Sequence, residues 1–178
     1  MKKTVLTFGL IAGAISAVMM LATVPFVHKM GNTQALIIGY TTIVLAALLV
    51  FFGVRSYRDN VGGGRVTFGR AFAVGILITI ISNACYVATW EVVNAKLMPD
   101  FADTHAAQMI ERAKASGASP EKIEKTTREA ADFKRMYKNP AIRMAWTFAE
   151  PFPVGLVITL ISAAVLRRKA AVQMRASA

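Results

Sequence analysis

The sequence predicts an all-α, polytopic membrane protein with four transmembrane helices and an extracytoplasmic helical hairpin between the third and the fourth. Three observations predict this class. The chain is 55% hydrophobic over 178 residues, more than a soluble core of this size needs. Its few charged residues are clustered, which leaves three long windows almost uncharged and a fourth with a single acid. Each window is long enough to cross a hydrocarbon core of ~30 Å, which takes ~20 helical residues.

The net charge of +11 does not indicate a nucleic acid partner. Proteins that bind nucleic acids gather Lys and Arg on one exposed face. Here the basic residues stand at the ends of the apolar windows and within one polar stretch, which is how membrane proteins place them. The expected partners are therefore membrane lipids, whose anionic head groups attract such residues. No nucleic acid is expected.

The first window covers residues 4–27 and follows Lys2 and Lys3. A cleaved signal peptide is the alternative, because secretory signals also begin with basic residues. The apolar stretch is longer than the ~7–15 residues of a usual signal core and ends without a clean Ala-x-Ala site, so a retained span is favoured. Gly9 and Gly13 are spaced for a close helix contact, within one chain or between two copies.

The other windows cover residues 34–54, 68–93 and 144–166. The second follows a link of only six residues, 28–33, which is short enough to make the first two helices antiparallel. Thr67 is placed to cap the third helix. Near the start of the fourth window, two prolines either bend the helix or form its entrance. These are Pro151 and Pro153.

Residues 96–143 form a polar, extracytoplasmic insert in what is otherwise a single membrane domain of residues 1–178. Two helices are predicted in the insert. The first ends at Gly117, and the second begins with Ser119 as its N-cap and Pro120 in its first position. The second helix is amphipathic and is expected to rest on another element. Its apolar face carries Ile123, Ala130, Phe133 and Tyr137.

The distribution of basic residues predicts that both termini are cytoplasmic. With four spans, the side of the termini holds ten of the 21 Lys and Arg residues, so the count alone does not decide. Basic residues next to span ends dominate orientation, and Lys2, Lys3, Arg55, Arg58 and the run at 167–169 all lie beside spans on the terminal side. The insert offsets its ten basic residues with seven acids.

The loop between the second and third windows resembles a known signature. The residues that carry it are Phe52-Gly53-Val54-Arg55-Ser56-Tyr57-Arg58-Asp59-Asn60, then Gly62-Gly63, then Val66-Thr67-Phe68-Gly69-Arg70-Ala71-Phe72. This string is similar to the bacterial membrane-protein family called domain of unknown function 4199. The resemblance covers nearly the whole chain and implies the same topology and a bacterial origin. That family has no established activity, so the resemblance implies no mechanism.

Two acids close to the hydrocarbon region are the first candidates for a functional site. A carboxylate there costs a few kcal/mol, so its presence calls for a reason. Counting helical rise from Arg70 and from Arg167 places Glu91 and Glu150 at similar depth, toward the outer side. The predicted polar intramembrane cluster consists of Glu91, Glu150, Asn83, Tyr86 and Asn94. The alternative is that Glu91 pairs with Lys96 or Arg143 and anchors the helix ends.

A second candidate is the basic loop around three consecutive glycines. Its arginines are Arg55, Arg58, Arg65 and Arg70. The loop lacks the Gly-Lys-Ser/Thr of a phosphate-binding loop and follows no buried strand, so it is not expected to bind nucleotides. We expect it to meet lipid phosphates or to dock a partner.

No residue pattern indicates catalysis, and the chain is not expected to be an enzyme. Cys85 is a lone cysteine inside an apolar window, and His28 and His105 lack the spacing of metal ligands, so neither a metal nor a cofactor is expected. The leading expectation is an accessory or interaction subunit of a membrane complex, with a protein partner or a homo-oligomer. The alternative is a small oligomeric transporter or channel that uses the Glu91 and Glu150 region.

Overall fold

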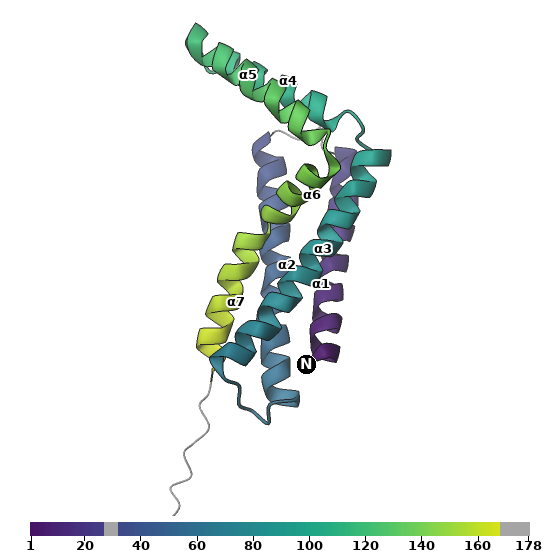
Figure 1. Cartoon of the computed structure of the whole chain (residues 1–178), viewed down its shortest axis with the longest axis vertical. Helices are drawn as coiled ribbons and strands as arrows, with labels where there is room; N and C mark the ends of the chain where they lie inside the picture. Colours follow the sequence, from purple (N-terminus) through teal and green to yellow (C-terminus); the bar gives the residue numbers. More distant parts are fainter. Residues whose placement is uncertain (27–31, 168–178) are drawn as a thin grey trace, which may run out of the picture. The chain divides into compact units, whose positions relative to one another are not determined.

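The computed structural model describes residues 1–26 and 32–167 of the chain. Its elements are α1 (Lys2–Thr23), η1 (Val24–Phe26), α2 (Asn32–Asn60), α3 (Phe68–Lys96), α4 (Phe101–Ala115), α5 (Pro120–Tyr137), α6 (Pro140–Ala149) and α7 (Phe152–Leu166) (Figure 1). All regular structure in these ranges is helical, which confirms the all-α prediction. Val27, His28 and the basic residues from 168 onward lie outside the described residues.

Four helical stretches are long and apolar enough to cross a membrane. They are Lys2–Phe26, Ile37–Asn60, Phe68–Lys96 and Pro140–Leu166. Each of them overlaps one of the four predicted windows, so the chain is an integral, multi-pass membrane protein. The last stretch is interrupted after Ala149, because α7 starts only at Phe152. The prolines at 151 and 153 therefore lie at a break between two helices, and α6 extends the helical structure back to Pro140.

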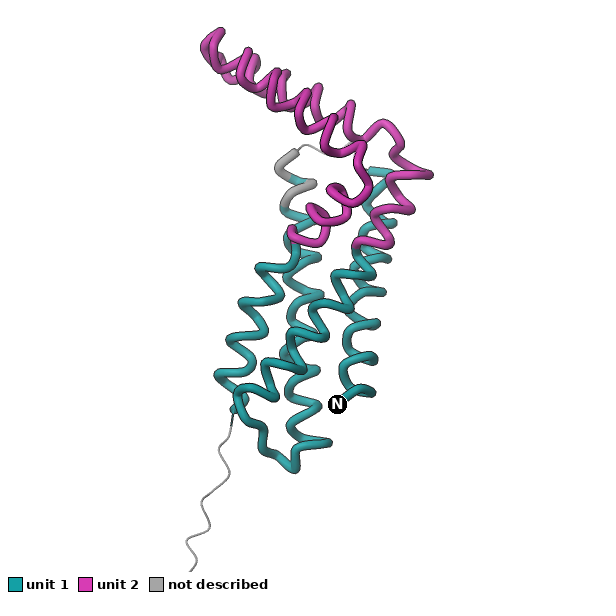
Figure 2. The backbone as a smooth tube through the Cα atoms, in the orientation of Figure 1, with its two compact units in different colours: residues 1–86, 151–178 teal, residues 87–150 magenta. Residues whose placement is uncertain are grey.

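The chain forms two compact units (Figure 2). Unit 1 comprises Met1–Tyr86 and Pro151–Ala178, and unit 2 comprises Val87–Glu150. Unit 1 holds α1, α2, α7 and the first part of α3, and unit 2 holds the remainder of α3 with α4, α5 and α6.

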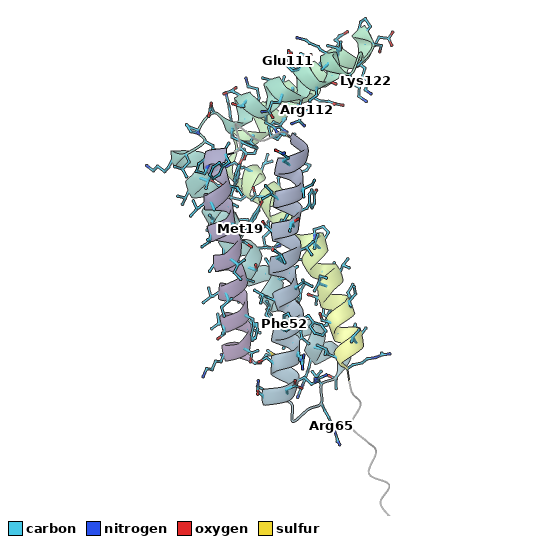
Figure 3. The ribbon with its side chains drawn as sticks, turned by 180° about the vertical axis from the view of Figure 1, so that it is seen from behind. Met19, Phe52, Arg65, Glu111, Arg112 and Lys122 are labelled. Atoms are coloured by element: carbon cyan, nitrogen blue, oxygen red, sulfur yellow. The ribbon has the colours of Figure 1, made fainter. Side chains whose placement is uncertain are left out.

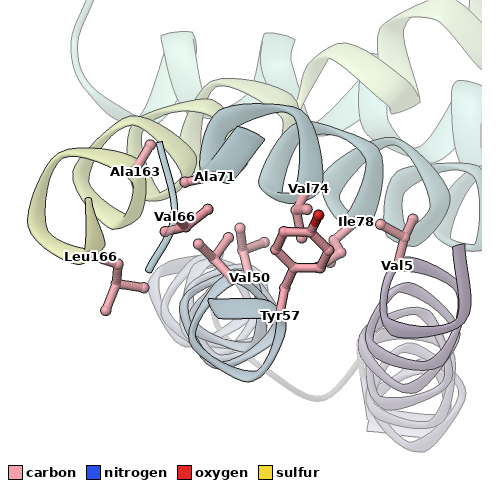
Figure 4. Packing of buried hydrophobic residues seen from close by; sticks show 10 residues of the cluster. Val5, Val50, Tyr57, Val66, Ala71, Val74, Ile78, Ala163 and Leu166 are labelled. Carbon is pink, nitrogen blue, oxygen red and sulfur yellow. The ribbon is translucent and has the colours of Figure 1, made fainter. Parts of the chain in front are cut away.

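The core of unit 1 lies at one end of its helices (Figure 4). Its members are alanines and β-branched side chains together with one tyrosine and one leucine. Val54, Tyr57, Val66 and Ala71, all buried, belong to the loop signature noted in the sequence. The signature therefore supplies the interior of the α2–α3 connection. The full core cluster is Val5, Val50, Val54, Tyr57, Val66, Ala71, Val74, Ile78, Ala163 and Leu166.

Two glycines of α1 allow this helix to approach α3 closely. On α1, a Cβ added to Gly13 would lie 2.5 Å from Cys85 Cβ, and one added to Gly9 would lie 2.8 Å from Ile81 Cβ. Real Cβ atoms do not come this close, so only glycine fits at either position. The Gly9 and Gly13 pair thus packs within the chain, which is one of the two contacts the spacing predicted.

Large apolar side chains cover the outside of the unit 1 helices. Met19 on α1 and Phe52 on α2 are both exposed (Figure 3). Their helices also expose Leu6, Leu10, Val18, Leu21, Tyr40, Leu45 and Leu48. A surface of this kind is unfavourable in water and is satisfied by hydrocarbon, as expected of membrane-spanning helices.

In unit 2, α4 and α5 lie side by side along their length (Figures 1 and 2). Gly117, with φ +68°, takes the left-handed conformation that ends α4, and the Ser119 hydroxyl accepts a 3.3 Å hydrogen bond from Lys122 N at the start of α5. Ala106 and Ala130 are buried, so the apolar face predicted for the second insert helix rests on the first.

Candidate functional site

Glu91 and Arg143 form an ion pair inside unit 2. Arg143 Nε donates a 2.8 Å hydrogen bond to Glu91 Oε1, and Arg143 Nη2 bonds to Glu91 Oε2, so the contact is bidentate. The two side chains are only 14% and 19% exposed. Arg143 Nη1 also donates a 3.2 Å bond to the carbonyl oxygen of Tyr137. Geometry of this kind is the strongest form of a carboxylate contact and holds the end of α3 against the start of α6.

A cluster of aromatic rings begins beside this ion pair at Tyr137. Trp90 Nε1 donates a 2.6 Å hydrogen bond to the Tyr137 hydroxyl, and the Arg143 guanidinium lies 5.6 Å from the centre of the Tyr137 ring. Phe101 contacts Trp90, with ring centres 4.8 Å apart, and also His105, at 5.6 Å. These contacts tie the end of α3 to α4, α5 and α6 within one unit.

The pKa of Tyr137 is raised to about 12, chiefly by burial and also by the Glu91 and Glu150 carboxylates, against the bond from Trp90 and the charge of Arg143, which lower it. The phenol therefore stays protonated at all physiological pH values. It acts here as a hydrogen-bonded group that joins α5 to α3.

The five residues of the predicted polar cluster are divided between the two units. Glu91, Asn94 and Glu150 belong to unit 2, whereas Asn83 and Tyr86 belong to unit 1. Glu150 is exposed and follows the last residue of α6, where its backbone N–H bonds to Trp146 O. The structure joins Glu91 to Arg143, one of the two partners weighed from the sequence. A shared site of Glu91 and Glu150 stays a prediction.

Asn83 and Tyr86 line a small cavity among the helices of unit 1. Its volume is about 20 Å³, and its polar lining comes from Ser16 on α1 together with Thr79, Ser82, Asn83 and Tyr86 on α3. Asn83 is 5% exposed. A cavity needs ~10–15 Å³ to hold one water molecule, which then requires two to four polar partners. This cavity therefore fits a single water molecule or a similarly small polar species.

A polar seam joins α3 and α7 beside the cavity. Thr79 Oγ1 lies 3.3 Å from Thr159 Oγ1, and Thr159 is fully buried. A Cβ on Gly75 would approach Thr159 Cγ2 to 2.8 Å, and one on Gly155 would overlap Thr79. Each threonine thus sits against the glycine of the other helix. The contact combines close backbone approach with a hydrogen bond between side chains, as is common among membrane helices.

The basic loop residues lie at the end of α2 and the start of α3. Arg58 Nε bonds to Asp59 Oδ1 at 2.6 Å, and Arg55 Nε lies 3.7 Å from Asp59 Oδ2. Arg65 and Arg70 are exposed. Gly63 and Gly64 have positive φ angles of 58° and 79°, which closes the turn. Thr67 Oγ1 accepts a 3.4 Å bond from Arg70 N, as expected of the cap.

Two features of the site region were not among the sequence predictions. The Trp90–Tyr137 bond joins residues 47 apart, and no local pattern predicts it. The seam, in contrast, leaves a trace: glycine precedes threonine by four residues in both helices, at Gly75 and Thr79 and at Gly155 and Thr159. Within residues 1–26 and 32–167, no group of three or more His, Cys, Asp and Glu side chains is arranged to hold a metal ion.

Comparison with known proteins assigns the chain to a family. A family model described as a protein of unknown function (DUF4199) matches residues 7–168, which is most of the chain. The chain belongs to this family. No curated protein and no solved structure matches it. The loop signature of this DUF4199 protein lies where α2, the glycine turn and α3 meet, and several of its side chains are buried in the core. Those positions have a structural reason that requires no ligand.

Proposed function

We propose that this DUF4199 protein is an accessory subunit of a larger complex in the bacterial inner membrane and not an enzyme. The observation that supports this most is the construction of unit 2. The Glu91–Arg143 ion pair, the Trp90–Tyr137 bond and the aromatic contacts hold a helical module of fixed shape. A module held in this way offers a partner a surface that needs no ordering upon binding, which favours affinity.

The outer surface of the α4–α5 pair is the proposed docking surface. The apolar face of α5 is already covered by α4, so charged residues remain outside (Figure 3). Those in exposed ion pairs include Glu111 with Lys114, Glu124 with Arg128, and Lys125 with Glu129. Exposed pairs contribute at most about 1 kcal/mol each and exchange partners readily. A protein partner with complementary charges would therefore bind here without disturbing the fold.

The proposed orientation places the termini in the cytoplasm and the α4–α5 pair outside. It is supported by four arginines at the turn that joins α2 and α3, because basic residues in short loops beside span ends favour the cytoplasmic side. These are Arg55, Arg58, Arg65 and Arg70. In this orientation the arginines of the turn meet the anionic cytoplasmic leaflet, which favours the arrangement by roughly 1 kcal/mol per basic residue.

Purification in mild detergent followed by mass analysis of the intact assembly tests the proposal. We expect a protein partner in fixed ratio, and we expect its loss when charge is reversed on the α4–α5 surface, for example in Arg128→Glu with Lys122→Glu. The matched control is Arg65→Glu, which reverses a charge on the α2–α3 turn and should keep the partner. A chain that purifies alone or only as copies of itself would contradict the accessory role.

A small oligomeric transporter is the second candidate, and the polar cavity of unit 1 favours it. Hydroxyl and amide groups converge there in a helical bundle, where polar residues are otherwise costly. This candidate also uses the Glu91 and Glu150 region of unit 2, which does not line the cavity, so Glu91→Gln, Glu150→Gln and the double variant should change thermal stability and its pH response in a coupled way. Simple additivity of the two single effects would exclude a site that the two acids share.

A further inference from the structure

An apolar groove lies in unit 2 where α5 ends and α6 begins. It is lined by Phe133, Met136, Tyr137, Ile142, Arg143 and Trp146, and its volume is about 180 Å³. Met136, Ile142 and Trp146 are exposed, and Trp146 is the most exposed of them at 66%. The two helices are joined by a turn in which Ala141 N donates a 3.0 Å hydrogen bond to Asn139 Oδ1.

Water is a poor occupant for this groove. Its walls are rings, a thioether and aliphatic carbon, and the one charged lining group, Arg143, is already bonded to Glu91 and to the Tyr137 carbonyl. Transfer of such apolar surface from water to hydrocarbon is favourable by roughly 25 cal/mol per Å². Because Met136, Ile142 and Trp146 leave the groove open to its surroundings, a hydrocarbon chain is the occupant that its chemistry favours.

The position of the groove along the chain places it at the edge of the membrane. Ile142, Arg143 and Trp146 lie in the first turns of the span Pro140–Leu166, while Phe133 and Met136 precede that span. Tryptophan is enriched at the level of lipid head groups, where its ring is partly in hydrocarbon. The hydrocarbon present at this level is the acyl chain of a lipid.

The charge around the groove selects among lipids. Residues 132–143 contain four basic residues and one acid. Lys138 is exposed in the turn directly after α5, and Arg135 is exposed one turn earlier, bonded only to the exposed Asp132 among the contacts described. Such exposed pairs yield readily to another anion. Lys138 directly follows the groove residue Tyr137 and also lies close enough to Asp103 on α4 to lower the pKa of that carboxyl, so a lipid phosphate near the groove would compete with Asp103 for Lys138.

We propose that the groove between α5 and α6 binds one anionic phospholipid, with an acyl chain against Trp146, Ile142 and Met136 and the phosphate beside Lys138. The lipid would act as a fixed component of unit 2. The proposal is independent of the accessory role, because it concerns the membrane and not a protein partner.

Quenching of tryptophan fluorescence by brominated lipid tests this binding. The full chain is reconstituted in phosphatidylcholine vesicles that contain a small share of brominated phosphatidylglycerol or, for comparison, brominated phosphatidylcholine. The chain has two tryptophans, so the Trp146→Phe variant isolates the Trp146 contribution by difference. We expect the anionic lipid to quench Trp146 about fivefold more effectively, the ratio that corresponds to ~1 kcal/mol for one basic residue near an anionic lipid.

Two lysine variants separate the groove from general surface charge. Lys138→Ala should abolish the preference for the anionic lipid, whereas Lys125→Ala, which removes an exposed lysine nearer the start of α5, should keep it. Equal quenching by the two lipids, or the same loss in both variants, would overturn the proposal. The proposal would also be overturned if neither lipid quenched Trp146 until the protein was diluted in the membrane. That result would mean that a second copy of the chain occupies the groove.

Discussion

At the scale of single residues, the pairing of Glu91 with Arg143 explains why an acid persists at the end of a membrane-spanning helix. An unpaired carboxylate close to hydrocarbon is costly, but a bidentate arginine supplies both charge and hydrogen bonds. The remaining guanidinium nitrogen is bonded to the Tyr137 carbonyl, so the arginine is satisfied as well. The pair fixes the start of α6 to the end of α3.

Removal of either partner should therefore destabilise unit 2 strongly. We expect Arg143→Ala to cost about 2–5 kcal/mol, because it leaves the Glu91 carboxylate without its partner in a largely buried position. Glu91→Gln combined with Arg143→Met should cost less than the sum of the single changes. Thermal unfolding in detergent measures the cycle, and strict additivity would show that the pair contributes nothing beyond packing.

His105 is expected to make the α4–α5 pair sensitive to acid. Burial against Phe101 and Phe133 lowers the pKa of His105, and the charge of Arg112 lowers it further. Since the unfolded chain then binds a proton more readily than the folded one, stability is complete above about pH 6.5 and is lost as the pH falls from there toward the folded pKa.

We expect the unfolding temperature of the protein to fall between pH 7 and pH 5 and expect His105→Gln to remove most of that dependence. Circular dichroism in detergent as a function of pH measures both. Lys134 lowers the pKa of Asp103 by a direct bond. The stability that this pair contributes is therefore lost only as the pH falls below about 4, the ordinary pKa of an aspartate, which is outside the range between pH 7 and pH 5. A pH response of the His105→Gln protein equal to that of the unchanged chain would assign the effect to another group.

At the scale of elements, the contact of α3 with α7 has an antiparallel register. Gly75 faces Thr159 and Thr79 faces Gly155, so a step of four residues up one helix matches a step of four down the other. The α1 and α3 contact is parallel, because Gly9 faces Ile81 and Gly13 faces Cys85. These directions are those of a chain that crosses the membrane alternately.

The glycines of the seam predict a sharp difference between two alanine variants. Gly155→Ala should destabilise the protein by about 1–3 kcal/mol, because its methyl group would overlap Thr79. Thr79→Ser should relieve part of this cost by removing the methyl group in the way. Gly69→Ala is the matched control, since its Cβ meets open space and alanine favours a helix. Thermal unfolding in which the two alanine variants behaved alike would contradict the seam.

Sequence patterns predicted the helices well because the relevant signals are local. Apolar length marks the spans, and the ends of the insert helices follow from Gly117 and Ser119, whose backbone needs are decided within a few residues. The break between α6 and α7 was harder to place, since Pro151 and Pro153 are equally compatible with a bend and with a helix start.

The candidate site was less predictable because its contacts are distant in sequence. Glu91 and Arg143 are 52 residues apart, and the sequence offered Lys96 and Glu150 as other neighbours. The choice among them depends on how α4 and α5 fold back, which no short pattern specifies. The same holds for the apolar groove, whose walls come from two helices that meet only after the turn at Lys138 and Asn139.

At the scale of the whole molecule, the central property is that α3 crosses the bilayer. It runs from Phe68 to Lys96, 29 residues, or ~44 Å at a rise of 1.5 Å per residue, which exceeds the ~30 Å hydrocarbon core. The turn before α3 and the α4–α5 pair after it must then lie on opposite sides of the membrane, whichever side is cytoplasmic.

Labelling of single cysteines with a membrane-impermeant maleimide in intact cells tests this property most directly. In a Cys85→Ala background, one cysteine is introduced at Val61, which is exposed in the turn, and in a second protein at Ser116, which is exposed at the end of α4. We expect the Ser116→Cys protein to react in intact cells and the Val61→Cys protein to react only after the membrane is opened. Reaction of both positions from the same side would contradict the crossing of α3.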